Sequence, residues 1–458
     1  MLRLFAAALL GFGALTAVAA APVARKPNIL LIVADDLGWG ELGFQGNPQV
    51  PTPHLDGLAA GGVRFTNAYV SAPICSPSRA GFLTGRYQQR FGHEFNAGNA
   101  NSSPPNFGLP VTETTLGDYL KKAGYMNGWF GKAHLGYAPQ FHPLRRGFDE
   151  FYGFLASHHD YLDGDLEEGN PLYRGTEPVA HFTHTTEDFA HEAISFIDRH
   201  QGGPWFVYLA FNAVHLPLQT TEKYLNRFPQ VTDPKRRTFC AMLSAMDDAI
   251  GEVLAKVHAT KADNDTLVIF ISDNGGPTTV TTSGNGVLHG GKGNLWEGGI
   301  REPFVLRWPG RIPAGQIDDR PVISLDILPT ALAAAGVTAT AEWKLDGVNI
   351  LPFVAGKNPG LPHDTLYWRY GPQLAIRRGD WKLVKAGGGA PRDLKGAASV
   401  DGAALYNLRK DISETENVAA ANPDRVRELS AAWQQWNAGL VPPAWAPGNE
   451  RRAGRDTP

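Results

Sequence analysis

The chain has 458 residues and only two cysteines, Cys75 and Cys240. At most one disulfide can form, so a disulfide framework is excluded as the basis of the fold. Beyond the first twenty residues no apolar run is long enough for a membrane span, so we expect no stable membrane insertion. The net charge is -3 and there is no long basic run. Binding of nucleic acid through a phosphate-neutralising patch therefore has no support.

The first residues are typical of a secretory signal. Arg3 precedes an apolar run from Leu4 to about Val18, and small residues follow at 17–21 as a cleavage site requires. The run is short for a membrane span, and no cysteine follows it to carry a lipid. We expect a signal peptide at 1–21 and a mature chain that is exported, either periplasmic or secreted. An N-terminal membrane anchor is the alternative.

The fold class is predicted from apolar segments that alternate with helical patterns. Near-continuous β-branched and apolar runs predict buried strands at 28–34, 125–130, 205–211, 266–272 and 303–308. Helices are predicted at 112–123, at 185–199 with a Thr-x-x-Asp cap, and at 239–257. We therefore expect an α/β domain at 22–340, with a large mixed, mostly parallel sheet sandwiched by helices.

The pattern changes after residue 340. Short strand candidates at 365–370, 374–378, 381–385 and 404–408 follow one another closely, which favours a small antiparallel sheet. A helix at 423–436 could pack on it. We expect a C-terminal α+β subdomain at 341–458, with a flexible loop at 386–396 and a loose tail after Pro442.

Two predicted strands end in acidic residues. Asp35 and Asp36 follow the first, and Asp273 and Asn274 follow the strand at 266–272. Such residues at a strand end are often only turn or cap residues. Because ligands gather at the carboxyl ends of strands, the four oxygen donors together favour Ca²⁺, with Mg²⁺ as the second choice. Zn²⁺ fits less well, since the pairs bring neither histidine nor thiolate.

Basic residues in glycine-rich or strand-end segments form a second group of candidates. Lys132 and His134 lie in Gly-Lys-Ala-His-Leu-Gly after a predicted strand, His215 follows the strand at 205–211, and Lys292 lies in Gly-Gly-Lys-Gly. Taken alone, a lysine is more often a solvated surface charge, and a histidine is more often a polar residue whose hydrogen bonds are satisfied within the fold. Lys132 and His134 are the better candidates, because small residues separate them in a glycine-bounded segment.

Cys75 begins the segment Cys-Ser-Pro-Ser-Arg, which ends at Arg79 and runs on to Thr84-Gly85. A cysteine in this setting can be a nucleophile, a metal ligand or a structural thiol. Cys240 has apolar neighbours at helical spacing and is interpreted as a core residue.

The Cys-x-Pro-Ser-Arg segment with its downstream Thr-Gly resembles the signature of the type I, formylglycine-dependent sulfatases of the alkaline phosphatase superfamily. The resemblance extends from the Asp-Asp pair through Gly-Lys-x-His-Leu-Gly to the C-terminal Leu-Tyr-Asn-Leu at 405–408. One departure is Ala133, where many relatives have tryptophan.

The resemblance implies that Cys75 is converted to formylglycine by a maturation enzyme and that its hydrate is the nucleophile. It implies that calcium is bound by Asp35, Asp36, Asp273, Asn274 and residue 75. Arg79 would hold the hydrate, and Lys132 and Lys292 would hold the sulfate. His215 would protonate the leaving alcohol and His134 would take the second hydrate proton. How the acid and base roles divide between the two histidines stays open.

The resemblance also implies a sulfated mono-, oligo- or polysaccharide as substrate. Polar and aromatic residues at 90–101 and 157–161 suit sugar hydroxyls and rings, so we expect substrate contacts from His93, Ser157, His158 and His159. Ordinary polar loops are the alternative for these segments. A phosphonate or phosphate ester hydrolase of the same superfamily, or a non-catalytic carbohydrate-binding relative, are the competing functions.

Overall fold

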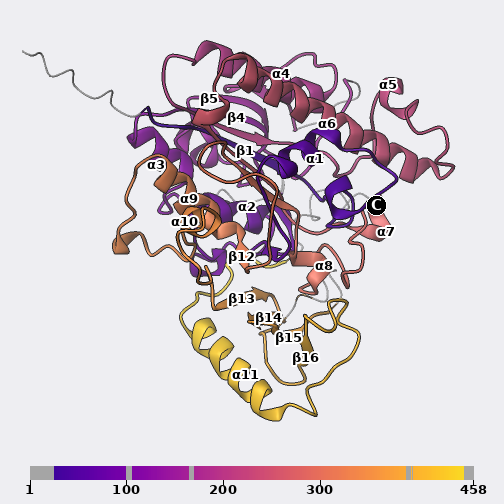
Figure 1. Cartoon of the computed structure of the whole chain (residues 1–458), viewed down its shortest axis with the longest axis vertical. Helices are drawn as coiled ribbons and strands as arrows, with labels where there is room; N and C mark the ends of the chain where they lie inside the picture. The colour runs from indigo at the N-terminus through magenta and orange to yellow at the C-terminus, as the bar shows by residue number, and fades with distance from the viewer. Residues whose placement is uncertain (1–24, 99–105, 164–169, 388–393, 395, 448–458) are drawn as a thin grey trace, which may run out of the picture.

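The computed structural model describes residues 25–98, 106–163, 170–387, 394 and 396–447, and Figure 1 shows the whole chain. The expected signal peptide lies outside these residues, as do the end of the tail and most of the glycine-rich loop at 386–396. Within the described ranges, no helix combines the length and the apolar composition needed to cross a membrane.

A ten-stranded sheet forms the centre of the larger part of the molecule. Its middle strands β9, β1, β8, β4 and β5 are parallel, and β10 joins β9 in the antiparallel sense. From edge to edge the strands are β11 (Gln316–Asp318), β2 (Val63–Phe65), β10 (Phe304–Arg307), β9 (Thr266–Ser272), β1 (Asn28–Ala34), β8 (Trp205–Ala210), β4 (Met126–Lys132), β5 (Glu150–Phe154), β6 (Tyr173–Arg174) and β7 (Glu177–Pro178). A two-stranded sheet joins β3 (Ala68–Tyr69) to β12 (Val322–Ile323).

Helices cover both faces of the large sheet, as Figure 1 shows. The central strands β1, β8 and β9 are nearly continuous in apolar residues because each face is buried: Ile29 and Leu31 of β1 enter one core cluster, and Leu30 and Ile32 enter the other. The second cluster is closed by α1 (Pro53–Ala60), α4 (Thr185–Arg199) and α6 (Pro234–Ala259). The first is closed by α2 (Cys75–Thr84), α3 (Leu116–Lys122) and α9 (Ile327–Ala334). Short helices complete the part before residue 360: α5 (Glu222–Leu225), α7 (Thr278–Thr281), α8 (Glu297–Ile300) and α10 (Leu351–Val354).

The C-terminal sheet is antiparallel and four-stranded, in the order β13 (Thr365–Tyr370), β14 (Gln373–Arg378), β15 (Trp381–Lys385) and β16 (Ala404–Asn407). One face, including Ala375 and Val384, joins the core cluster of the large sheet. The other face, including Leu374 and Ile376, packs on Trp433 of α11 (Pro423–Ala438). The predicted mostly parallel α/β fold and the small antiparallel sheet are both confirmed.

Three helix starts differ from the sequence prediction. The helix expected from residue 239 begins five residues earlier, at Pro234, where Asp233 is the N-cap and its side chain accepts the backbone N–H of Arg236. The helix expected from residue 112 begins at Leu116, because Thr115 and Asp118 form a reciprocal capping box there. Thr185 is the first helical residue of α4 and not its cap. His184 is the N-cap residue, and the Asp188 carboxylate accepts the backbone N–H groups of Thr183 and His184 instead.

Candidate active site

The acidic residues meet because β1 and β9 are adjacent parallel strands whose ends are in register, with Ala34 opposite Ser272. The next residues of both strands therefore leave the sheet at the same edge. The backbone N–H of Asp36 donates to Asp273 Oδ1 at 3.2 Å, and Asn274 Nδ2 donates to Asp36 Oδ1 at 2.8 Å. All of these side chains are buried.

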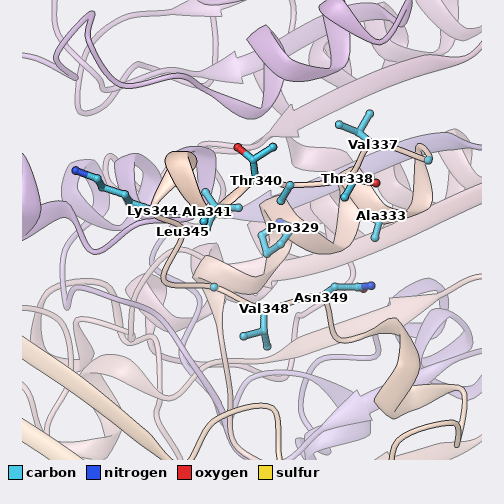
Figure 2. Close-up of a pocket in the computed structure, with 13 residues that line it drawn as sticks. Pro329, Ala333, Val337, Thr338, Thr340, Ala341, Lys344, Leu345, Val348 and Asn349 are labelled. Atoms are coloured by element: carbon cyan, nitrogen blue, oxygen red, sulfur yellow. The ribbon is translucent and has the colours of Figure 1, made fainter.

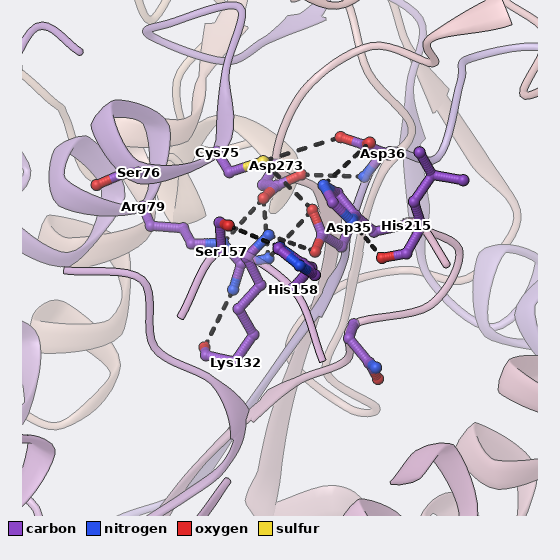
Figure 3. Close-up of polar contacts among 12 residues, drawn as sticks. Asp35, Asp36, Cys75, Ser76, Arg79, Lys132, Ser157, His158, His215 and Asp273 are labelled. Atoms are coloured by element: carbon purple, nitrogen blue, oxygen red, sulfur yellow. Dashed lines mark hydrogen bonds and ion pairs between the residues drawn. The ribbon is translucent and has the colours of Figure 1, made fainter. Parts of the chain in front are cut away.

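Cys75 is the first residue of α2, and its side chain points at the acidic pair (Figure 3). The thiol Sγ lies 3.4 Å from Asp35 Oδ1 and 3.8 Å from Asp36 Oδ1. Arg79 lies one helical turn later, so it faces the same way. Its Nη2 is 2.8 Å from Asp273 Oδ2, and both side chains are 0% exposed. The Cys-x-Pro-Ser-Arg spacing thus places residue 75 and a guanidinium on one helix face.

Two lysines from different parts of the chain pair with Asp35 and Asp36. Lys132 is the last residue of β4, and its Nζ lies 2.5 Å from Asp35 Oδ2. The preceding Gly131 has a φ of 112°, and a Cβ there would lie 1.9 Å from the carbonyl oxygen of Ala210. Only glycine fits this approach, which explains the first residue of the Gly-Lys segment. Lys292 comes from the glycine-rich loop and places Nζ 2.6 Å from Asp36 Oδ1.

The two predicted histidines differ in their exposure. His215 has a side chain 15% exposed, and its Nε2 lies 3.7 Å from Asp36 Oδ2. Its Nδ1 is 2.7 Å from the carbonyl oxygen of Leu216, so Nδ1 carries the proton and Nε2 faces Asp36. His134 is buried with a φ of 53°, and neither ring nitrogen has a hydrogen-bond partner among the described residues. His134 is thus available to a group that enters the site.

The pKa values of the acidic residues in this site are shifted in opposite directions. Burial by itself raises the pKa of the Asp36 carboxyl, but nearby positive charge, that of Lys292 foremost, outweighs it and holds that pKa well below its ordinary value. Burial, followed by the charge of Asp35, raises the pKa of Asp273 to about 6, although Arg79 opposes this. The cluster therefore contains one carboxyl that is firmly ionised and one that holds a proton more readily.

Burial also sets the charge of the histidines. It lowers the pKa of His215 to about 3, and it lowers that of His134 well below its ordinary value with help from the charge of Lys132. Both imidazoles are therefore neutral near pH 7. Burial opposes the charge of Lys292, but Asp36 raises the pKa of this ammonium well above its ordinary value, so Lys292 stays cationic.

The donor set fits a hard divalent cation. Ligand atoms of Asp35, Asp36, Cys75 and His215 all lie within 4.8 Å of one another. Asn274 Oδ1 is buried and has no hydrogen-bond partner in the described part of the chain. An orphaned carboxamide oxygen beside two carboxylates is an unsatisfied ligand position of the kind that Ca²⁺ or Mg²⁺ fills.

The expected substrate residues divide into two groups. Ser157 and His158 lie beside the site, where the ring of His158 stacks at 6.4 Å from that of His215 (Figure 3). His93 is fully buried against Ser76 and Trp445, and His159 is buried against Phe154. Aromatic packing covers both rings, so neither His93 nor His159 is exposed in this structure, and their contact with a sugar stays a prediction.

Two buried residues near the site, Ser283 and Glu302, were not predicted from the sequence. Ser283 Oγ donates to the carbonyl oxygen of Asp36 and accepts the N–H of Gly38, both at 2.8 Å, which fixes the loop after β1. Glu302 is buried with both carboxylate oxygens unpartnered among the described residues. Burial, followed by the charge of Asp273, raises the pKa of Glu302 well above its ordinary value. Neither residue belongs to a motif that reveals its role.

A separate hollow of about 660 Å³ lies between the end of α9 and the segment 336–349 (Figure 2). Pro329, Val337 and Val348 make part of its wall, and Lys344 lies at its edge. None of the acids, lysines or histidines of the site lines it, so it takes no part in the chemistry described here.

The fold and the site together define a class of protein. A reactive position, a group of buried oxygen donors able to hold a metal ion, and two lysines at the carboxyl edge of a mostly parallel sheet are typical of hydrolases that act on anionic esters. The competing reading as a non-catalytic binding protein does not explain why ionisable groups with displaced pKa values converge here.

Comparisons with known proteins identify the family. The family model described as sulfatase matches residues 27–337, and the one described as N-sulphoglucosamine sulphohydrolase, C-terminal, matches residues 291–433. The N-acetylgalactosamine-6-sulfatase of Canis lupus familiaris is 34% identical over 384 residues, which cover 79% of this chain and 72% of that protein. Arylsulfatase A of Homo sapiens is 33% identical over 452 residues, covering 89% and 87%. The chain belongs to the sulfatase family and is a sulfuric ester hydrolase.

A solved structure agrees with this assignment. The crystal structure of Ps i-CgsB in complex with k-i-k-neocarrahexaose superposes with a TM-score of 0.84 at 33% sequence identity, covering 92% of this chain and 95% of that one. The agreement includes nearly the whole described fold, so the C-terminal sheet is part of the shared architecture.

Proposed function

We propose that this protein removes sulfate from a sulfated carbohydrate, with formylglycine formed from Cys75 as the reactive group and Ca²⁺ as the bound metal. The observation that carries the proposal is the convergence at residue 75: two carboxylates lie within 3.4 and 3.8 Å of its sulfur, and each carboxylate is paired with a lysine. The Cys75 sulfur stands in for an oxygen of the hydrated aldehyde.

The cysteine itself is poorly suited to act as the nucleophile. Burial raises the pKa of the Cys75 thiol well above its ordinary value, and the nearby lysines do not reverse this. A thiol that stays protonated is a weak nucleophile. Conversion to a hydrated aldehyde supplies one hydroxyl for attack and a second for turnover by elimination. The conversion requires a formylglycine-generating maturation enzyme as a partner of this chain.

Asp35, Asp36, Asp273, Asn274 and residue 75 are the groups that would hold Ca²⁺, with Mg²⁺ as the second choice. The ion, when bound, supplies Lewis-acid polarisation of a sulfate oxygen and lowers the pKa of the attacking hydroxyl. Lys132 and Lys292 now neutralise Asp35 and Asp36. If a cation took over the neutralisation of those carboxylates, both ammonium groups would be able to hold the sulfate oxygens in the transition state.

We assign the proton transfers to four residues of the site. Asp273, with a pKa of about 6, is the group we assign to accept the proton of the attacking hydroxyl. We assign the proton donation to His215 together with Lys292: both groups lie at Asp36, and because Nε2 of the neutral imidazole carries no proton, the proton that reaches the leaving alcohol would come from the Lys292 ammonium. His134 is neutral and unpartnered among the described residues, and we assign it the proton of the second hydroxyl.

The carbohydrate part of the proposal is supported by the names of similar proteins. One relative is an N-acetylgalactosamine-6-sulfatase, and the Ps i-CgsB structure was solved with k-i-k-neocarrahexaose. Ser157 and His158 beside His215 are the residues we propose for the first sugar contacts. Export to the periplasm or the medium, and the division into residues 22–340 and 341–458, belong to the same proposal.

The test compares turnover of an aryl sulfate with that of the matching aryl phosphate, followed by a panel of defined sulfated mono- and oligosaccharides. We expect sulfate release from the aryl sulfate and from at least one saccharide, with Cys75→Ala as the inactive control. Dominant phosphatase or phosphonatase activity would contradict the sulfatase chemistry. Aryl sulfate turnover without release from any sulfated saccharide would contradict the substrate class.

A further inference from the structure

The helix that begins with residue 75 has no cap of its own. The N-cap position of α2 is Ile74, whose side chain cannot accept a hydrogen bond from the first backbone N–H groups. The backbone N–H of Ser76 instead donates to Asn96 Oδ1 at 3.2 Å. A side chain twenty residues further along the chain thus supplies the cap that the local sequence lacks.

The side chain of Ser76 is held as firmly as its backbone. Its Oγ lies 2.7 Å from His93 Nε2, and both residues are 0% exposed. Burial lowers the pKa of His93 to about 3, so this imidazole is neutral and acts only as a hydrogen-bond partner. A buried hydroxyl with one partner at this distance has a fixed direction, and it fixes the first turn of α2 with it.

Trp445, in the segment after α11, covers the other side of these residues. Its indole Nε1 donates to the carbonyl oxygen of Asn96 at 2.8 Å. Its ring stacks on Phe107 with centroids 4.9 Å apart and meets His93 edge-on at 4.8 Å. Trp445 itself is 6% exposed. The C-terminal part of the chain therefore packs on His93 and Asn96, the two residues that hold Ser76.

Ser76 cannot touch the substrate. Successive residues of an α-helix point about 100° apart, and Figure 3 shows Ser76 directed away from the acids that Cys75 faces. On the face that Cys75 shares, the helix is held one turn later by the ion pair of Arg79 with Asp273 at 2.8 Å. The contacts of Arg79 on the side of the acids and those of Ser76 on the other side together leave the start of α2 little freedom to rotate.

We propose that Ser76, His93, Asn96 and Trp445 form a clamp that positions the side chain of residue 75 against Asp35 and Asp36. These four are positioning residues for the reactive group, and the inference rests on the proposed formylglycine chemistry. A rotation of the first turn would swing the reactive oxygen away from the carboxylates and the bound sulfate. Because a displacement of about 1 Å at a reacting atom can cost about a hundredfold in rate, loosening the clamp lowers kcat.

The main test measures kcat and KM of Ser76→Ala and Ser76→Thr with an aryl sulfate. The fraction of residue 75 present as aldehyde is determined by peptide mass spectrometry in every preparation, because Ser76 lies next to the residue that must be converted. We expect kcat per aldehyde-containing enzyme to fall about tenfold in Ser76→Ala while KM changes less than about twofold. The hydroxyl of Ser76→Thr should restore most of kcat. Unchanged kcat per aldehyde in Ser76→Ala would overturn the clamp.

A double-mutant cycle checks that the two side chains act through one contact. His93→Phe and the double variant Ser76→Ala/His93→Phe are compared with the single change. If the hydroxyl and the imidazole act only through their hydrogen bond, the double variant should be no slower than the slower single variant. Fully additive losses would show that the contact is not the source of the effect and would overturn the clamp.

A third experiment, Trp445→Phe with a matched control, tests whether the indole hydrogen bond contributes to the clamp. Phenylalanine keeps the stacking on Phe107 and removes the donor to Asn96, so kcat per aldehyde should fall severalfold. The control is Trp433→Phe, because Trp433 is equally buried and donates Nε1 to the carbonyl oxygen of Trp368 at 2.9 Å. The control should lower the unfolding temperature and leave kcat unchanged. Equal kcat losses in both variants would overturn the inference.

The proposed chemistry and the clamp fail in distinguishable ways. If mass spectrometry finds no aldehyde at residue 75 in active wild-type enzyme, the proposed function fails and the clamp loses its basis. If wild-type enzyme carries the aldehyde and the Ser76, His93 and Trp445 variants match its kcat per aldehyde, only the clamp fails.

Discussion

Replacement of Lys132 by methionine tests whether this lysine holds a sulfate oxygen in the transition state. Methionine keeps the length of the side chain and removes the ammonium, which lies 2.5 Å from Asp35 Oδ2 with both groups 0% exposed. Loss of one preorganised charge-stabilising group typically lowers kcat by about 10² to 10³, or about 3–4 kcal/mol of transition-state stabilisation. We expect a loss of this size for an aryl sulfate, with the metal affinity retained because Asp35 remains.

The variant also breaks a buried ion pair, which alone destabilises a fold by about 3–5 kcal/mol. Lys382→Met is the matched control, because Lys382 is another lysine with 0% exposure and pairs with Glu297 at 2.8 Å and Glu414 at 2.9 Å outside the site. Both variants should unfold at lower denaturant concentration, but only Lys132→Met should lose kcat per folded, aldehyde-containing enzyme. Comparable kcat losses in the two variants would refute a direct role for Lys132 in sulfate binding.

Three further predictions follow from the site and the fold. His215→Gln should lower kcat by about 10² for a sugar sulfate and much less for a nitrophenyl sulfate, whose leaving group needs no proton; equal losses in kinetic assays would contradict the acid role. Asn274→Ala removes the orphaned Oδ1 and should weaken Ca²⁺ binding at least about tenfold in a calcium titration; unchanged affinity would exclude this ligand. Burial raises the pKa of Asp247 from 3.8 to about 6, so ionisation costs the folded state more than the unfolded state. The unfolding free energy of wild type relative to Asp247→Asn should therefore fall by about 2–3 kcal/mol between about pH 4 and pH 7 in denaturant titrations, and a rise would contradict the shift.

Much of the fold could be predicted because its strands are buried on both faces. The segments of β1 and β9 are apolar except at their ends, and the bounds predicted for them agree with the structure. The acids that follow them meet because the two strands are parallel and in register. The site could therefore be predicted wherever it depends on strand ends and short motifs.

What the sequence did not reveal depends on contacts between distant segments. His93 was expected to face a sugar, but Trp445, more than three hundred residues later, covers its ring. No local pattern indicates that pairing. The start of α3 was misplaced for a different reason: Thr112 and Thr115 are both acceptable caps by type, and only the contact of Thr115 with Asp118 decides between them.

The central claim is that residue 75 is an aldehyde in the working enzyme. Peptide mass spectrometry of protein from its native host, measured in parallel with sulfatase activity, tests this most directly. We expect the peptide that contains residue 75 to carry the mass of formylglycine, and the activity of different preparations to rise in proportion to the converted fraction. An active preparation in which Cys75 is entirely an unmodified thiol would contradict the account.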